Sequence, residues 1–285
     1  MQFEMLRIAV AAAGLLVATY YDLFNKRNVP VNITYFMIGA GFLLNIATLD
    51  ISLIAYSSLA ALIVMGLGYL IYRTGQIGGA DVLIFAAIAL LFPSFPASIL
   101  APSAPPFFEF PFVASVFIIS GLLSIFGIGA IYIPRVLRDL AKGKVKLNAT
   151  SAFSAFAMLI SFLAVIYVLG PYIPFQSGQA ILALVMLLAI FLILFKDHIS
   201  SSMIEWVPFS QIDDEDVVAL DLLNPKLVAK YSLQRVATRT ELEKLKKTGL
   251  KKFPVFKGMP AFVPYILLAV LLLLVFGDPL WLLFY

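Results

Sequence analysis

The chain has 285 residues, of which 62% are hydrophobic and only 13% are charged, whereas about a quarter of the residues of an ordinary soluble protein are charged. This composition excludes a simple soluble globule. A mean hydropathy of +1.01 over the whole length requires several apolar segments, because one anchor of about 20 residues would not raise the average so far. We therefore predict a polytopic membrane protein.

Eight apolar segments have the length that crosses a hydrocarbon core of about 30 Å. Asp50 is the only break between the second and third, so we place a tight turn at Thr48-Leu49-Asp50. The predicted fold class is an all-α transmembrane helix bundle of about six to eight spans with a small cytoplasmic insert. The segments are 5–21, 31–49, 51–72, 80–100, 112–133, 151–169, 178–195 and 261–277.

The basic residues predict an orientation in the membrane. If the N-terminus lies outside, 19 of the 20 Lys and Arg residues fall in cytoplasmic segments and only Arg7 does not, as the positive-inside rule requires. An alternative interpretation makes residues 1–20 a cleavable signal peptide. We favour a first span that is retained. Glu4 offsets the positive charge of Arg7, and the basic segments fall on one side of the membrane only if this helix is present.

The spans divide the chain into four regions. A catalytic membrane core is expected over 1–100, and further membrane helices with a basic cytoplasmic loop at 134–150 over 101–195. A cytoplasmic polar segment occupies 196–258, and the last span lies within 259–285. The proline- and aromatic-rich stretch 101–111 is expected to lie stiffly at the outer membrane interface.

The polar segment is divided by charge. Residues 196–221 hold seven acids and one lysine, whereas 222–258 hold ten bases and two acids. Thr238 and Glu241 have the spacing of a capping box, which predicts a short helix that ends near Gly249. We expect the basic stretch from Lys244 to Lys257 to bind anionic membrane lipid, and no known nucleic-acid-binding pattern is present.

The sequence lacks the residues that most metal and thiol chemistry requires. It has no cysteine and a single histidine, His198, which leaves no disulfide, cysteine nucleophile or paired-histidine zinc motif. We predict no metal and no cofactor. His198 lies beside Asp197 and near Ser200, but without a G-x-S-x-G motif we interpret it as a surface-loop residue and not as part of a hydrolase triad.

Two carboxylates do not lie in a segment that is expected to be exposed to water. Fourteen of the 16 acidic residues fall in polar segments or at outer helix ends, whereas Asp22 follows the first predicted span and Asp81 opens the fourth, both at the cytoplasmic boundary. Acidic residues at such positions are costly and usually functional. Two adjacent carboxyls share a proton, so one can take a proton from water while the other polarises a peptide carbonyl. Gly78 and Gly79 would allow unusual backbone dihedral angles and the close approach of a substrate strand.

These residues carry a family resemblance. The chain resembles an archaeal preflagellin or type IV prepilin peptidase, a membrane aspartyl protease of the GxGD type, most clearly over residues 1–100 and the last helix. The resemblance implies that Asp22 and Asp81 are catalytic and that Gly78, Gly79 and Ala80 form the glycine motif. The implied substrates are prepilins or preflagellins, whose class III signal peptides are cut on the cytoplasmic side. The matching residues are Gly78-Gly79-Ala80-Asp81, Tyr21-Asp22 with Lys26-Arg27 and Val29-Pro30, and Phe262-Val263-Pro264 with Phe276-Gly277-Asp278.

The chain departs from the family pattern at several points. Ala80 stands where the named motif has glycine, and Leu83 stands where many bacterial enzymes have lysine. The cysteine-bearing insert of bacterial relatives is missing, so their N-methyltransferase activity is not implied. About six spans are expected from the family but eight are predicted here, so the resemblance does not explain the region 101–258.

Other interpretations remain open at this stage. The run Asp213, Asp214, Glu215 and Asp216 is either a solvated face or a substrate-binding site for the basic start of a prepilin signal. A proton-coupled transporter that relays protons through the two aspartates is the alternative function, although we find no internal repeat of the transporter kind. A presenilin-like enzyme is a third option, but the chain has no Pro-Ala-Leu motif.

Overall fold

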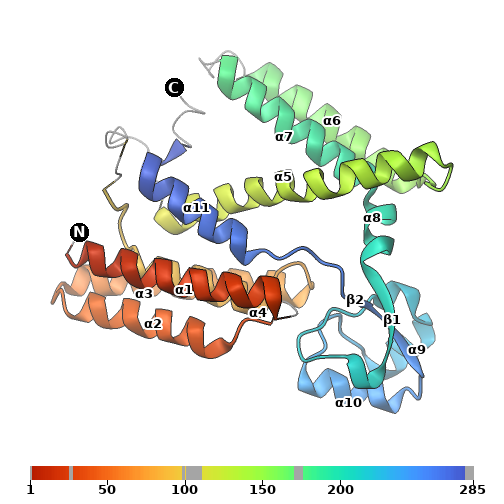
Figure 1. Cartoon of the computed structure of the whole chain (residues 1–285), viewed down its shortest axis with the longest axis horizontal. Coiled ribbons are helices and arrows are strands. Elements are labelled where there is room, and N and C mark those ends of the chain that lie inside the picture. Colours follow the sequence, from red (N-terminus) through yellow and green to blue (C-terminus); the bar gives the residue numbers. More distant parts are fainter. Residues whose placement is uncertain (1, 26–27, 98–99, 101–110, 170–175, 280–285) are drawn as a thin grey trace. The chain divides into compact units, whose positions relative to one another are not determined.

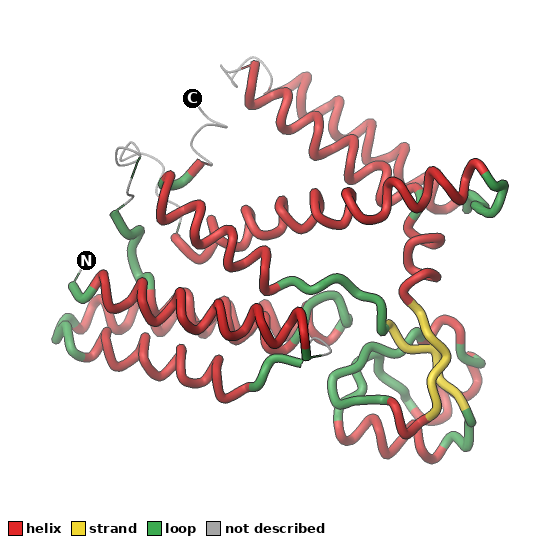
Figure 2. Tube along the Cα trace, in the orientation of Figure 1, coloured by secondary structure: helices red, strands yellow, loops and turns green. Residues whose placement is uncertain are grey.

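The computed structural model describes residues 2–279 apart from 26–27, 98–99, 101–110 and 170–175 (Figures 1 and 2). The predicted interfacial stretch 101–111 therefore lies almost wholly outside the described residues, as do Lys26 and Arg27. The chain forms two compact units that alternate along the sequence. We call residues 2–93 and 202–261 the first unit, and residues 94–201 with 262–285 the second unit.

The first unit begins with four helices: α1 (Glu4–Phe24), α2 (Val31–Ile46), α3 (Ile51–Arg73) and α4 (Gly79–Leu91). The helices α1, α2 and α3 all pack on α4, and ten of the 13 residues of α4 are buried. The central position of α4 follows from its sequence, since a helix that is apolar on every side needs partners on every side.

The break between α2 and α3 lies where the sequence places it. Asp50 is the N-cap of α3, and its Oδ1 accepts hydrogen bonds from the backbone N–H groups of Ser52 at 3.0 Å and Leu53 at 3.2 Å. These bonds satisfy two of the backbone donors that a helix start leaves free. The predicted pair of helices is confirmed.

Helix α4 is shorter than the predicted span 80–100, because it ends at Leu91. Pro93 and Pro96 follow, and the fixed ring of proline does not continue a helix. The last carbonyls of α4 accept side-chain hydrogen bonds from the bundle interior: Arg7 donates to Leu91 O at 3.0 Å, and Asn45 donates to Leu90 O at 2.9 Å. Arg7, the one basic residue that the charge pattern did not explain, is thus a helix-capping residue.

The rest of the first unit is a small domain with its own core. Strand β1 (Ile204–Pro208) pairs antiparallel with β2 (Lys252–Phe256), which adds a two-stranded sheet to the predicted all-helical fold. Short helices α9 (Pro225–Tyr231) and α10 (Arg239–Lys247) accompany the strands. The core is apolar and consists of Val207, Ile212, Val218, Leu223, Leu233, Ala237, Leu245, Phe253 and Val255.

Helix α10 confirms the helix predicted from Thr238 onward, but the predicted capping box is not formed. The hydroxyl of Thr238 does not accept a bond from a backbone N–H of the helix start; it lies 3.1 Å from the hydroxyl of Thr240. Glu241 instead accepts a bond from the backbone N–H of Gln234 at 3.0 Å. The spacing was therefore correct for a helix start, while tertiary contacts gave Glu241 a different partner.

Gly75, in the loop between α3 and α4, is needed for conformation and for space. Its φ is +75°, and a Cβ there would lie 2.9 Å from Cγ1 of Val217 in the small domain. Gly75→Ala is therefore expected to destabilise the protein by about 1–2 kcal/mol. Gly66→Ala in α3 is the matched control, because a Cβ there meets nothing within 4 Å. Thermal unfolding in detergent measures both; equal midpoints for the two variants would contradict the prediction.

The second unit contains α5 (Phe112–Ala141), α6 (Ala149–Leu169), α7 (Gln176–Leu194), most of α8 (Lys196–Met203) and α11 (Val263–Phe276). Helix α5 packs on α7 and α11, and α6 packs on α7. Helix α5 continues through Pro134 to Ala141, so the first part of the predicted basic loop 134–150 is helical. Arg and Leu residues after Pro134 favour helix, and the charge pattern alone does not mark its end.

His198 lies in helix α8 and not in a loop, which corrects the sequence interpretation. Its Nε2 is 3.2 Å from Oδ2 of Asp139 in α5. The neighbouring Asp197 accepts bonds from Ser151 Oγ at 2.9 Å and Asn148 Nδ2 at 3.0 Å. These are contacts between helices, and the interpretation that no hydrolase triad is present stands unchanged.

The helices are those of a multi-pass membrane protein. Among the described residues, four helices are long and apolar enough to cross a membrane, namely α1, α3, α5 and residues 149–168 of α6. The segment 179–194 with α8, bent by 67°, raises this number to five if it forms one span. Helices α2, α4 and α11 are shorter apolar helices. The all-α class is confirmed, while the number of spans is not fixed by helix length.

Candidate active site

The structure brings together the two aspartates that the sequence singled out. Asp22 lies in the last turn of α1 and Asp81 in the first turn of α4. Both are buried, with exposed fractions of 6% and 9%, and their carboxylates interact electrostatically. Two acidic groups from separate helices thus share one site at the ends of α1 and α4.

Asp81 is held by the start of its own helix. One carboxylate oxygen, Oδ2, accepts a hydrogen bond of 3.0 Å from the backbone N–H of Gly78. The positive end of the helix dipole favours an acidic side chain at this position. The local sequence therefore fixes the carboxyl of Asp81 at the N-terminus of a helix that is itself buried on all sides.

Gly78 and Gly79 provide space and not unusual dihedral angles. The φ and ψ of Gly78 are −74° and 152°, an extended conformation that any residue adopts, so that part of the prediction was wrong. A Cβ on Gly78 would lie 3.0 Å from Oδ2 of Asp81, and a Cβ on Gly79 would lie 3.0 Å from Oε1 of Glu215. The missing side chains thus let carboxylates approach the backbone.

A third carboxylate, Glu215, reaches the same place from the small domain and interacts electrostatically with Asp81. Its loop is anchored to the segment 235–237 by backbone bonds. The N–H of Glu215 donates to Ala237 O at 3.0 Å, and the N–H of Ala237 donates to Asp216 O at 2.8 Å. Glu215 therefore lies on a turn that the core of the small domain holds in place.

The four acids predicted to bind substrate have different positions. Lys257 donates to Asp213 at 3.3 Å and also bonds Asp216, so these two acids are paired within the small domain. Asp214 and Glu215 instead face an open pocket. The pairing also means that Lys257, predicted to bind lipid, is engaged within the protein.

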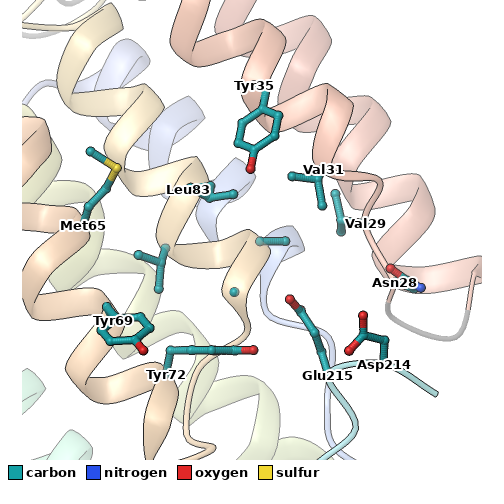
Figure 3. Close-up of a pocket in the computed structure, with 13 residues that line it drawn as sticks. Asn28, Val29, Val31, Tyr35, Met65, Tyr69, Tyr72, Leu83, Asp214 and Glu215 are labelled. Carbon is teal, nitrogen blue, oxygen red and sulfur yellow. The ribbon is translucent and has the colours of Figure 1, made fainter. Parts of the chain in front are cut away.

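The pocket has a volume of about 470 Å³ and lies within the first unit (Figure 3). Gly79 and Ala80, the two residues that precede Asp81, form part of its wall. Its carboxylates come from the loop of the small domain, whereas aromatic and aliphatic side chains come from the membrane helices. The side chains that line it include Tyr35, Met65, Tyr69, Tyr72, Leu83, Asp214 and Glu215.

The sequence analysis missed the tyrosines of this pocket. Tyr69 and Tyr72 are three residues apart in α3, with ring centroids 6.3 Å apart, and this spacing places two side chains on one face of a helix. The spacing alone does not show what that face meets.

Among the described residues, no group of three or more His, Cys, Asp or Glu side chains is arranged to hold a metal ion.

The carboxyl of Glu215 predicts a pH effect on stability. Glu215 is an exposed residue, but partial desolvation of its carboxyl, followed by the charge of Asp214, raises its pKa. The folded state then binds more protons than the unfolded state between the ordinary glutamate pKa and the raised one, so stability is lost as pH rises through this window.

Glu215→Gln removes this titration. The unfolding temperature of the variant minus that of the wild type is expected to increase between about pH 4 and about pH 8. Thermal unfolding in detergent across this range measures the difference, and Glu243→Gln on the exposed side of α10 is the control. A difference that stays constant with pH, or decreases as pH rises, would contradict the argument.

Comparison with known proteins adds independent findings. Residues 9–133 match the model of the type IV leader peptidase family, a range that includes both aspartates and the glycine motif. The prepilin peptidase EppA of Methanothermobacter thermautotrophicus is 28% identical over an alignment of 204 positions, which covers 66% of this chain and 52% of that protein. The chain thus spans about half the length of this curated relative. No solved structure gives a significant match.

Proposed function

We propose that the chain is a membrane aspartic endopeptidase, because residues 9–133 match the model of the type IV leader peptidase family, in agreement with the resemblance seen in the sequence. It cuts the class III signal peptides of archaeal prepilins or preflagellins at the cytoplasmic face of the membrane. The observation that carries the proposal is the buried pair Asp22 and Asp81, which lies within the family match and whose carboxylates interact electrostatically.

The two carboxyls have different roles in hydrolysis. With one proton between them, the ionised carboxyl takes a proton from a water molecule, and the protonated carboxyl donates a hydrogen bond to the scissile carbonyl oxygen. The water oxygen bonds to the carbonyl carbon, and the C–N bond then breaks as the leaving nitrogen receives a proton. Gly78, which carries no side chain, lets the carboxyl of Asp81 lie against the backbone at the start of α4.

The place of cutting follows from the predicted topology. Asp22 ends α1 and Asp81 begins α4, so both lie at a helix end and not at its middle. If the basic residues mark the cytoplasmic side, the site meets a substrate where its apolar helix leaves the membrane. A proton relay through the membrane would instead require polar groups at intermediate depth.

The proposal is tested with the full-length protein in liposomes and a panel of archaellin and pilin precursors. Mass spectrometry of the products is expected to show one cut, just before the apolar segment of a precursor. A pH-sensitive dye inside the same liposomes tests the transporter alternative. The proposal fails if no precursor is cut while the protein dissipates an imposed proton gradient.

A further inference from the structure

The pocket beside Asp81 has two chemically different parts. One part is built from the rings of Tyr35 and Tyr69 and from Met65 and Leu83, which offer aromatic and aliphatic surface. The other part is acidic, with Glu215 at the end that adjoins Gly79. Figure 3 shows the carboxyl of Glu215 pointing into the pocket and the hydroxyl of Tyr72 directed toward it.

The acidic end retains unneutralised charge. Lys257 pairs with Asp213 and Asp216, and the nearest charged partner of Asp214 is Arg239 at 3.8 Å. Among the residues that the structure describes, no basic side chain forms an ion pair with Glu215. Of the four acids in this loop, Glu215 is therefore the one whose charge is left for a ligand.

We infer that this pocket binds a lysine or arginine side chain of the substrate near the bond that is cut, and that Glu215 determines this specificity. The inference rests on the proposed function. A basic side chain has an aliphatic stem and a cationic end, which match the apolar wall with its aromatic faces and the carboxylate of Glu215. A neutral polar side chain would gain little there, and an acidic one would be repelled.

The position of the pocket ties it to the reaction. Gly79 and Ala80 belong to its wall, and Asp81 is the next residue in α4. A side chain held in the pocket therefore belongs to a residue close to the scissile bond. Glu215 lies outside the predicted dyad but interacts electrostatically with Asp81, so its loss can also change the chemical step. The subsite is therefore measured as the ratio of kcat/KM between two substrates, because a change in the chemistry that both substrates share cancels in this ratio.

The test uses two synthetic peptides that carry the same apolar helix and differ only before it, one with lysine and one with glutamine. Glu215→Gln is expected to lower the preference for the lysine peptide over the glutamine peptide, measured as the ratio of their kcat/KM values, by about tenfold, the loss of roughly one charge-assisted contact. Glu243→Gln, an exposed carboxylate of α10, is the matched control. Equal changes for both peptides, or no change for either, would overturn the inference.

Two further measurements test the substrate preference of the subsite independently of cleavage. Glu215→Lys is expected to reverse the preference, so that a peptide with glutamate at the same position binds better than the lysine peptide. Peptide binding to Asp22→Asn/Asp81→Asn, followed by fluorescence anisotropy, reports the preference without turnover. If the binding preference for lysine depends on Glu215 but the wild type cuts no precursor, the subsite is supported and the peptidase is rejected. If the wild type cuts precursors without that preference, the peptidase is supported and the subsite is rejected.

Discussion

Asp81→Asn is expected to lower the rate of precursor cleavage by about 10³-fold or more, the magnitude associated with loss of a general acid or base. Asparagine keeps the shape of the side chain and still accepts a hydrogen bond from Gly78 N–H, but it cannot hold or release the proton. Asp22→Asn should have an effect of the same order, because the proposed mechanism needs one proton shared between two carboxyls.

The comparison requires a carboxylate of the same unit that takes no part in the site. Asp221 is exposed and pairs with Arg235 at 2.6 Å, so Asp221→Asn is expected to cut at the wild-type rate. Cleavage of a purified precursor, followed by gel shift and mass spectrometry, measures all three variants. Wild-type cleavage by either dyad variant would show that the corresponding aspartate has no catalytic role.

Arg7→Met is expected to lower the free energy of unfolding by about 2–4 kcal/mol, because it leaves carbonyl groups unsatisfied where no water reaches them. Arg7 is fully buried. Its Nη1 donates to Asn45 Oδ1 at 2.8 Å, to Leu91 O at 3.0 Å and to Leu90 O at 3.3 Å. Methionine fills similar space but donates none of these bonds.

Loss of the Arg7 hydrogen bonds should also disturb the candidate active site. Arg7 at the start of α1 contacts the end of α4, while Asp22 at the end of α1 interacts with Asp81 at the start of α4. The two helices are therefore antiparallel, and Arg7 holds one end of the pair whose other end carries the aspartates. We expect Arg7→Met to reduce both the unfolding temperature and kcat.

Arg73→Met provides the matched control, since Arg73 is an exposed residue in the last turn of α3. Unfolding in detergent, followed by circular dichroism, compares the two substitutions. If Arg7→Met is no more destabilising than Arg73→Met, the bonds of Arg7 to α4 do not stabilise the fold.

Because the chain has few charged residues, the two candidate catalytic aspartates could be identified from the sequence. In a chain with so few acids, Asp22 and Asp81 were conspicuous because Asp22 directly follows one apolar segment and Asp81 opens another, and burial of a carboxylate without a purpose is costly. The same reasoning left Arg7 unexplained, since a cation at the outer end of the first span violates the charge rule. Its reason lies in a tertiary contact with the end of α4, which no local pattern contains.

Glu215 shows where sequence reasoning reached its limit. The acidic run was recognised as a candidate substrate-binding segment, but its four members looked equivalent. They differ because Lys257, about 40 positions away, pairs with Asp213 and Asp216. Backbone bonds with Ala237 hold the turn that carries Glu215, and this turn places the Glu215 carboxyl beside Gly79. Such contacts depend on the fold of the small domain and are not written in the spacing of the charges.

The predicted lengths of α4 and α5 were wrong for related physical reasons. Apolar residues beyond Leu91 suggested a longer span, but the prolines at 93 and 96 end the helix, and Arg7 and Asn45 satisfy its last carbonyls. In α5 the reverse occurred, since a basic loop was predicted from residue 134 while the helix continues through Pro134 to Ala141. Hydropathy identifies a helix better than it identifies its ends.

The most direct test of the shared-proton dyad is a double-mutant cycle in cleavage rate. We measure single-turnover cleavage of one precursor by the wild type, Asp22→Asn, Asp81→Asn and the double variant. If the carboxyls act as one unit, the double variant is expected to be no slower than the slower single variant. If the two losses multiply, Asp22 and Asp81 act independently and the account is wrong.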